Sequence, residues 1–324
     1  MRVVVIGATG HVGGYLIPRL VAAKHEVIAI SRGTHALYRN HPAWQEVTRV
    51  TADRQAEDAA GTFAGRVADL YPDVVIDMVC FTPESARQLV DALRDRIELF
   101  LHCGTIWVHG PAVEVPVIED AVRRPFGDYG VGKAAIEQLL LHETRIGGMR
   151  SVVLHPGHIS GPGWPVINPA GNLDLGVWTR LATGRTVTLP NFGLETLHHV
   201  HPSDVAQAFE LALKRQSVAV GESFHVASDR AITLRGFADA VAGWFGRDAD
   251  LRFVPFEAFR QVTGPEDAEV TWEHISRSTS ASIDKARRLL GYAPRYTSLQ
   301  AVAEAVHWLH EKGELDLGSN ELVF

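Results

Sequence analysis

The sequence predicts an α/β fold in which a doubly wound parallel sheet is joined to a smaller C-terminal α/β lobe. In the first half, short runs of β-branched residues alternate with longer helical stretches, a pattern typical of parallel strands with covering helices. The run at residues 3–6 is apolar at every position, as expected when both faces of a strand are covered. A length of 324 residues exceeds one simple core and predicts two lobes.

The strands of the sheet are expected at residues 3–6, 27–30, 47–51, 74–79 and 99–102. From residue 156 onward, Pro and Gly interrupt this pattern, and a domain boundary is predicted near Ser160. The first domain is therefore residues 1–160 and the second lobe is residues 161–324. Residues 197–226 have the pattern of a strand, a helix and a strand, so we expect residues 193–226 to rejoin the first sheet.

The composition favours a small-molecule partner. The formal charge of −7 gives no broad attraction for nucleic acid or for an anionic membrane. No apolar run is long enough to span a bilayer and the first strand begins at Arg2, so we expect no membrane segment, no signal peptide and a cytoplasmic location. Cys80 and Cys103 form no Cys-x-x-Cys pair and are expected to be buried thiols.

A glycine-rich loop follows the first strand directly and precedes a helical stretch at residues 14–23. Glycines let the backbone turn tightly and let phosphates approach, while the helix start offers unpaired N–H groups and a positive dipole end. This context makes an ordinary strand-to-helix turn the weaker alternative and predicts a Rossmann-type dinucleotide-binding domain. The predicted cofactor contacts in this loop are Gly7, Thr9, Gly10, His11, Val12 and Gly13.

The end of the second strand bears on the type of dinucleotide. An acid there would bind the ribose hydroxyls of NAD, but this strand ends in Ser31 and Arg32. Because a guanidinium binds phosphate in a bidentate manner, NADP is favoured and NAD is the alternative. Asp53 and Arg54, after the third strand, are candidates to reach the adenine edge or else form an exposed turn pair.

Tyr129 and Lys133 lie four residues apart at the start of a helical run at residues 129–142, so both side chains project from one face. A neighbouring ammonium lowers the pKa of a phenol. Such a tyrosine can exchange a proton with a substrate hydroxyl or carbonyl while a nicotinamide exchanges a hydride. Taken alone, the pair could equally be a solvated helix face.

Four motifs together resemble the extended short-chain dehydrogenase/reductase family, in particular its NAD-dependent epimerase/dehydratase branch, over nearly the whole chain. They are the glycine loop from Gly7 to Gly13, the fourth strand at residues 73–77, the segment from Tyr129 to Lys133 and a closing segment at residues 282–294. The resemblance implies a substrate-orienting hydroxyl after the fifth strand, which is Thr105 here, and a homodimer formed through the active-site helix and its neighbour. The remaining predicted cofactor contacts are Val79, Lys133 and Pro156.

The chain departs from the family pattern at three places. Ile106 and Trp107 follow Thr105, where dehydratases of the family carry acids, so redox chemistry or redox epimerisation is favoured over elimination. His158 replaces an asparagine of the nucleotide-sugar enzymes, and Leu197 stands where their diphosphate-binding arginine is expected. A smaller or less anionic, sugar-like substrate therefore fits better than a nucleotide-linked sugar.

Histidines are concentrated at residues 155–158 and 198–201, which raises the alternative of a zinc site. No Glu-x-x-His helix accompanies them, so we expect no metal and assign part of the group to the substrate pocket, with Trp164 adding to its apolar wall. The predicted substrate contacts are Phe81, Thr105, Trp107, His158 and His199. The alternative function is that of a dinucleotide-binding regulatory protein without catalysis.

Overall fold

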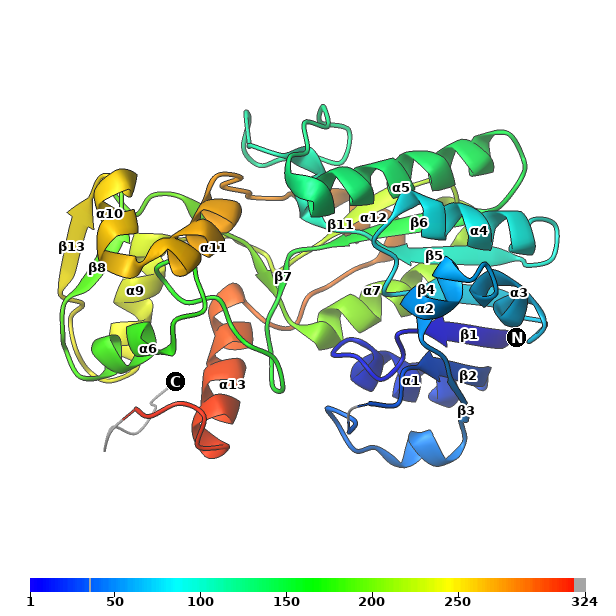
Figure 1. Cartoon of the computed structure of the whole chain (residues 1–324), viewed down its shortest axis with the longest axis horizontal. Helices are drawn as coiled ribbons and strands as arrows, with labels where there is room; N and C mark the ends of the chain where they lie inside the picture. The colour runs from blue at the N-terminus through cyan, green and yellow to red at the C-terminus, as the bar shows by residue number, and fades with distance from the viewer. Residues whose placement is uncertain (35, 318–324) are drawn as a thin grey trace.

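The computed structural model describes residues 1–34 and 36–317, which form two lobes side by side (Figure 1). Within these residues the sheet of the larger lobe has seven strands, all parallel, in the order β11-β6-β5-β4-β1-β2-β3. The strands are β1 Arg2–Ile6, β2 Glu26–Ser31, β3 Thr48–Thr51, β4 Val74–Asp77, β5 Leu99–Cys103, β6 Ser151–Pro156 and β11 Ser223–Val226. The predicted α/β fold with a doubly wound sheet is confirmed.

Helices cover both faces of this sheet. One face is packed by α1 Gly13–Ala22, α7 Pro202–Lys214 and α12 Asp284–Leu290. The other face is packed by α3 Phe63–Ala68, α4 Pro83–Leu93 and α5 Gly127–Arg145, and α2 Arg54–Ala59 precedes α3. Successive residues of β1 alternate between the two cores, with Val3 and Val5 in one and Val4 and Ile6 in the other. This explains why the strand is apolar at every position.

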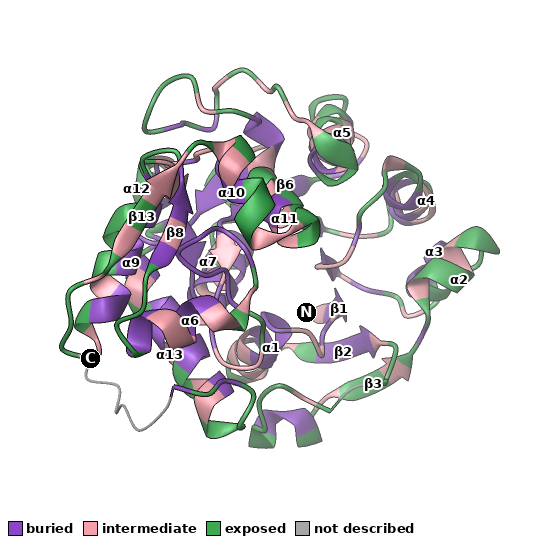
Figure 2. Cartoon of the chain, turned by 60° about the vertical axis from the view of Figure 1, so that its left-hand side comes forward, coloured by how far each residue is buried: buried purple, intermediate pink, exposed green. Residues whose placement is uncertain are grey.

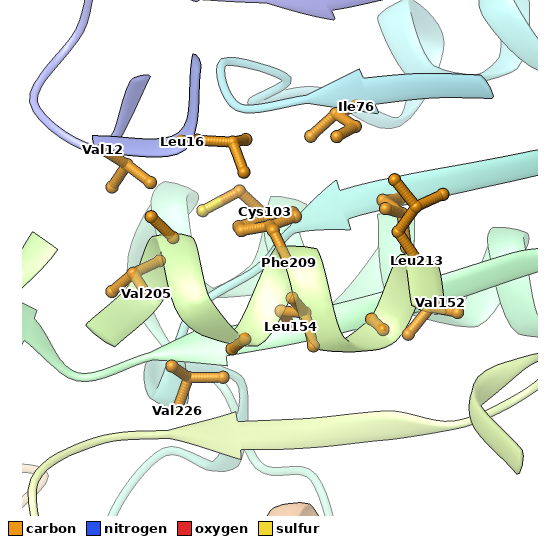
Figure 3. Close-up of a cluster of buried hydrophobic side chains, with 14 of the residues drawn as sticks. Val12, Leu16, Ile76, Cys103, Val152, Leu154, Val205, Phe209, Leu213 and Val226 are labelled. Carbon is orange, nitrogen blue, oxygen red and sulfur yellow. The ribbon is translucent and has the colours of Figure 1, made fainter. Parts of the chain in front are cut away.

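Apolar side chains of α7 fill the core on the first face. In Figure 3, Val205, Phe209 and Leu213 of α7 lie together with Leu16 of α1 and with Leu154 of β6. Phe209 is fully buried. Burying a side chain of this size stabilises a fold by roughly 1.5–3 kcal/mol. Helix α7 therefore belongs to the core of the larger lobe, although the chain passes through the smaller lobe before reaching it.

The smaller lobe packs helices around short strands, and Figure 2 shows buried segments where these elements meet. Its buried residues form a separate core that includes Trp178 and Phe237. Its helices are α6 Leu175–Ala182, α9 Leu234–Gly243, α10 Phe256–Thr263, α11 Pro265–Ile275 and α13 Ser298–Glu311. Its strands are β8 Val187–Pro190, β9 Thr196–Leu197, β12 Ile232–Thr233 and β13 Leu251–Val254. The other short elements are η1 Pro42–Gln45, η2 Ile106–His109, β7 His158–Ile159, β10 His199–Val200 and α8 Gln216–Ala219.

The chain crosses between the lobes at β7 and returns at β10, and these two strands pair in parallel beside the end of β6. After β10, the chain forms α7 and then β11, which pairs with β6 at the edge of the large sheet. The domain boundary near Ser160 stays a prediction. None of the helices in the described ranges combines the length and the apolar composition that crossing a membrane requires.

Candidate active site

The glycine loop lies between the carboxyl end of β1 and the start of α1. Gly7 has a φ of +82°, a conformation that favours glycine. A Cβ atom on Gly13 would lie 1.8 Å from the carbonyl oxygen of Ala8, so a larger residue cannot occupy this position without moving the backbone. The loop therefore keeps the N-terminus of α1 open to close approach, and this cradle fits the pyrophosphate of a dinucleotide.

A cavity of about 470 Å³ extends from this loop along the carboxyl ends of the central strands to residues of the smaller lobe. Most predicted site residues lie on its wall: Gly7, Gly10, His11, Val12, Gly13, Val79, Phe81, Thr105, Trp107, Tyr129, Lys133, Pro156 and His158. The wall does not include five others within the described residues: Thr9, Arg32, Asp53, Arg54 and His199. The fold thus brings the glycine loop and the tyrosine helix to one cavity.

Tyr129 and Lys133 lie on the first turns of α5, and Thr105 caps the short helix η2. The Lys133 Nζ atom donates a hydrogen bond of 2.6 Å to the carbonyl oxygen of Cys103. It lies 5.8 Å from the centre of the Tyr129 ring and 5.0 Å from that of Phe81. The ammonium is therefore fixed between the end of β5 and the two aromatic rings.

The protonation of this group differs from the sequence-based expectation. Partial burial raises the pKa of Tyr129, and the neighbouring Thr105 hydroxyl acts in the opposite direction. Lys133 was expected to lower this pKa, but its hydrogen bond goes to Cys103, and burial lowers the pKa of the lysine itself. The phenol therefore carries its proton at neutral pH, which suits a proton donor.

The far side of the cavity presents neutral imidazoles and indoles. The Trp107 Nε1–H donates to Nε2 of His158 over 3.4 Å, so the proton of the neutral His158 ring is on Nδ1. That nitrogen is buried and has no hydrogen-bond partner among the described residues. Burial, together with the neighbouring His274 and His199, holds the pKa of His158 well below its ordinary value. His158 is therefore a neutral ring whose protonated nitrogen is buried inside the wall.

His274 of α11 completes this side of the cavity. Its Nδ1 donates to the carbonyl oxygen of Gly171 over 2.8 Å, which leaves Nε2 as an acceptor. Its ring centre lies 5.5 Å from that of Trp107 and 5.3 Å from that of His158. Burial lowers the pKa of His274, so this imidazole is also neutral. His199 lies behind His158, with 5.6 Å between ring centres, and supports the wall from inside.

The residues predicted near the adenosine end have different surroundings. Arg32 is exposed directly after β2. Asp53 caps α2 by accepting from the Ala56 amide, and the Arg54 guanidinium donates to the Asp77 carboxylate over 2.6 Å. Arg54 is thus held by a buried carboxylate below the cavity, and the assignment of both residues to the cofactor stays a prediction.

Several wall residues carried no signal in the sequence, among them Met78, Ile167, Leu173 and His274. His274 lies more than a hundred residues beyond the other active-site motifs and belongs to no recognisable pattern. His11, predicted as a cofactor contact, stacks on Trp164 with ring centres 5.2 Å apart and bonds to the Pro162 carbonyl. In the described part of the chain, no three His, Cys, Asp or Glu side chains are grouped so that they could hold a metal ion.

Known proteins resemble this chain in sequence and in fold. The family model described as "NAD dependent epimerase/dehydratase family" matches residues 3–227. A 2′-dehydrokanamycin reductase of Streptomyces kanamyceticus is 27% identical over 97% of this chain and 86% of its own length. A chloroplast stem-loop binding protein of 41 kDa from Arabidopsis thaliana is 22% identical over 99% of this chain and 84% of its own. The crystal structure of a UDP-glucose 4-epimerase from Thermotoga maritima has a TM-score of 0.72 at 18% identity, over 96% of this chain and 99% of that one.

Proposed function

The chain belongs to the NAD-dependent epimerase/dehydratase family, and from this premise we propose that it is an oxidoreductase or epimerase acting on a hydroxyl or carbonyl carbon of a small, sugar-like substrate. The cofactor of the family is a nicotinamide dinucleotide. The observation that carries the proposal is the position of Tyr129, Thr105 and Lys133 on one wall of the cavity that begins at the glycine loop.

The loop from Gly7 to Gly13 would hold a nicotinamide dinucleotide, which would supply or accept the hydride. Tyr129 donates its proton to the carbonyl oxygen in the direction of reduction, and takes a proton back in the direction of oxidation. The Thr105 hydroxyl, on the wall of the same cavity, orients the reacting oxygen. The Lys133 ammonium lies 5.8 Å from the centre of the Tyr129 ring, where it would also contact the cofactor, as the sequence predicts.

Two features of the wall support an uncharged substrate. Among the described residues, Lys133 is the only Lys or Arg on the wall, and its ammonium is already bonded to Cys103. The opposite side offers the Nε2 acceptor of the neutral His274 ring, which matches a hydroxyl group of a sugar. The relative named as a 2′-dehydrokanamycin reductase is consistent with a reductase activity. Elimination is disfavoured because no acid follows Thr105.

NADP is the proposed cofactor, with NAD as the alternative. The end of β2 carries no carboxylate that would repel a ribose phosphate, and Arg32 follows it as an exposed guanidinium. A guanidinium binds a phosphate through two parallel hydrogen bonds, which an NAD ribose cannot provide.

The decisive experiment replaces Tyr129 by Phe. Oxidation of NADPH is followed with 2′-dehydrokanamycin, a free keto-hexose and a nucleoside diphosphate keto-hexose. We expect Tyr129→Phe to lose at least about 100-fold in kcat, because general acid catalysis contributes that much, with NADPH affinity unchanged. Tyr71→Phe, at an exposed tyrosine outside the cavity, is the control. Full turnover in Tyr129→Phe contradicts the proposed mechanism.

The second candidate is a dinucleotide-binding protein without turnover. The Arabidopsis thaliana relative, named as a stem-loop binding protein, favours testing it. The charge of −7 and the pairing of Tyr129 with Lys133 argue for the enzyme. Calorimetric binding of NADPH without oxidation of NADPH by any keto substrate, together with salt-sensitive retention of RNA on a filter, would favour the second candidate.

A further inference from the structure

A buried chain of hydrogen bonds begins at the amide of Thr105. The Thr105 N–H donates to Nδ1 of His155 over 3.0 Å, and Nε2 of His155 lies 2.9 Å from Oε1 of Glu137. The guanidinium of Arg123 binds both oxygens of the same carboxylate, at 3.0 and 2.7 Å. His155 is fully buried and Glu137 nearly so. The cavity wall includes neither His155 nor Glu137, within the described residues, so the proposed mechanism does not use them.

The positions of the protons in this chain follow from its fixed donors. Because the Thr105 amide can only donate, Nδ1 of His155 carries no proton, and its Nε2 carries the proton that Glu137 accepts. Glu137 stays ionised, since His155 and Arg123 outweigh the effect of burial and hold its pKa well below the usual range. The tautomer of His155 is therefore set by groups on both sides of its ring.

The chain of hydrogen bonds continues beyond Arg123, and each donor there again faces an acceptor. Nδ1 of His225 donates to the carbonyl oxygen of Ser282 over 3.0 Å, so its Nε2 accepts from Nε2 of His109 over 2.7 Å. Nδ1 of His109 then accepts from Arg123 over 3.1 Å. These hydrogen bonds thus end at Ser282, in the closing segment that the sequence analysis identified, and they connect this segment to the loop that carries Thr105.

Two further observations indicate that His155 acts on the position of this loop. A Cβ atom on Gly104 would lie 2.4 Å from Nδ1 of His155, so the imidazole is pressed against the backbone beside Thr105. Glu137 follows Tyr129 and Lys133 at intervals of four residues on α5, and therefore lies on the same side of the helix. The imidazole connects the helix that holds the phenol to the loop that holds the hydroxyl.

We propose that His155 is a positioning residue: oriented by Glu137, it binds the Thr105 amide and fixes the Thr105 hydroxyl against the Tyr129 phenol. This inference rests on the role proposed for Thr105. Misplacing a reacting group by about 1 Å costs roughly 100-fold in rate. We therefore expect His155→Leu to lower kcat about 10- to 100-fold and to leave NADPH affinity unchanged.

His201, which is not part of these hydrogen bonds, is a matched control elsewhere in the protein. Its Nδ1 accepts from the Ser203 amide over 3.2 Å and its Nε2 lies 3.1 Å from Glu304, so it has the same kinds of partners at both nitrogens. His201 is also fully buried, but it caps α7 and is not on the cavity wall. His201→Leu is expected to lower thermal stability as His155→Leu does, with kcat unchanged.

The test has one arm that needs no turnover. Hydrogen exchange of the Thr105 amide, measured by NMR on the full chain, should become at least about tenfold faster in His155→Leu, because about 1.4 kcal/mol of protection corresponds to a factor of ten. It should stay slow in His201→Leu. His155→Asn, whose side-chain oxygen can replace Nδ1 as the acceptor, should restore part of the protection and covers the case in which His155→Leu does not fold.

The second arm is a double-mutant cycle with Thr105→Val, measured as kcat and KM for keto-hexose reduction. If His155 acts through Thr105, His155→Leu has no further effect on kcat once the hydroxyl is gone. Additive losses, or unchanged exchange of the Thr105 amide in both His155 variants, overturn the inference. Absence of turnover in the wild-type chain counts against the proposed function alone, and the exchange arm then decides whether His155 holds the loop.

Discussion

The two halves of the cavity are formed by different kinds of groups. The dinucleotide half consists of backbone and glycines from one short stretch, Gly7 to Gly13, between a buried strand and a helix start. The substrate half consists of side chains, such as Trp107, His158 and His274, that come from elements far apart in the chain. Local sequence therefore determines the first half, whereas the packing of one lobe against the other determines the second.

The largest effect expected in the dinucleotide half is that of Gly13→Ala. The new Cβ would lie 1.8 Å from the Ala8 carbonyl oxygen, so the loop must move. We expect the affinity for NADPH and for NADH to fall about 100-fold, which corresponds to roughly 3 kcal/mol of steric cost. Calorimetry checks this. Gly14→Ala is the control, because its Cβ meets Arg39 at an ordinary 3.5 Å, and equal binding by the two variants contradicts the model of the cradle.

A smaller effect is expected at the outer edge of the same half, from Arg32→Ala. Loss of a charged hydrogen bond costs about 1.5–3 kcal/mol, so NADPH affinity should fall roughly 10- to 100-fold with NADH affinity unchanged. Parallel titrations with the two coenzymes measure this difference. Arg49→Ala, an exposed arginine on the neighbouring strand β3, changes the net charge equally and should leave both affinities unchanged. Tighter binding of NADH than of NADPH by the wild type contradicts the assignment of Arg32.

In the substrate half, we expect His274→Phe to raise KM for a keto-hexose about 3- to 10-fold, the value of one neutral hydrogen bond. The phenyl ring keeps the aromatic contact with Trp107 but has no Nε2 acceptor. NADPH affinity should not change, since the two halves are separate. His310→Phe is the control, because Nδ1 of His310 also bonds to a backbone carbonyl, that of Leu315, on a helix away from the cavity. A change in NADPH affinity without a change in KM would contradict the assignment of His274 to the substrate half.

The smallest effect concerns the stability of the substrate half in acid. Burial, with smaller effects of His198 and His274, lowers the pKa of His199 from 6.5 to about 3 in the folded chain. Between these values the unfolded chain binds a proton that the folded chain does not, so the stability is present above pH 6.5 and is lost as the pH falls.

From about pH 7 to about pH 5.5, this histidine alone should reduce the free energy of unfolding by about 1 kcal/mol. In urea unfolding, the free energy of unfolding of His199→Leu should therefore fall less than that of the wild type between these two pH values, and the difference should equal this amount. His142→Leu, at an exposed histidine on α5, is the control and should lose as much stability as the wild type. Identical pH dependence in His199→Leu and the wild type would contradict this account.

The sequence contained enough information for the sheet because its signals are local. The apolar run of β1 and the loop that follows it depend on neighbouring residues, and the same holds for Tyr129 and Lys133, whose spacing places them on one face of a helix. The resemblance to the family, based on these motifs, is confirmed by the match over residues 3–227. Boundaries were less accurate: β4 ends at Asp77, two residues earlier than predicted.

What the sequence alone determined is thus the fold class, the glycine loop and the presence of a tyrosine and lysine on one helix. Tertiary structure decided which groups surround them: that Lys133 bonds to Cys103, that Arg54 pairs with Asp77, and that His274 reaches the cavity from the second lobe. The physical reason is that backbone geometry and periodicity act over a few residues, whereas burial and hydrogen-bond partners depend on chain segments that meet only after folding.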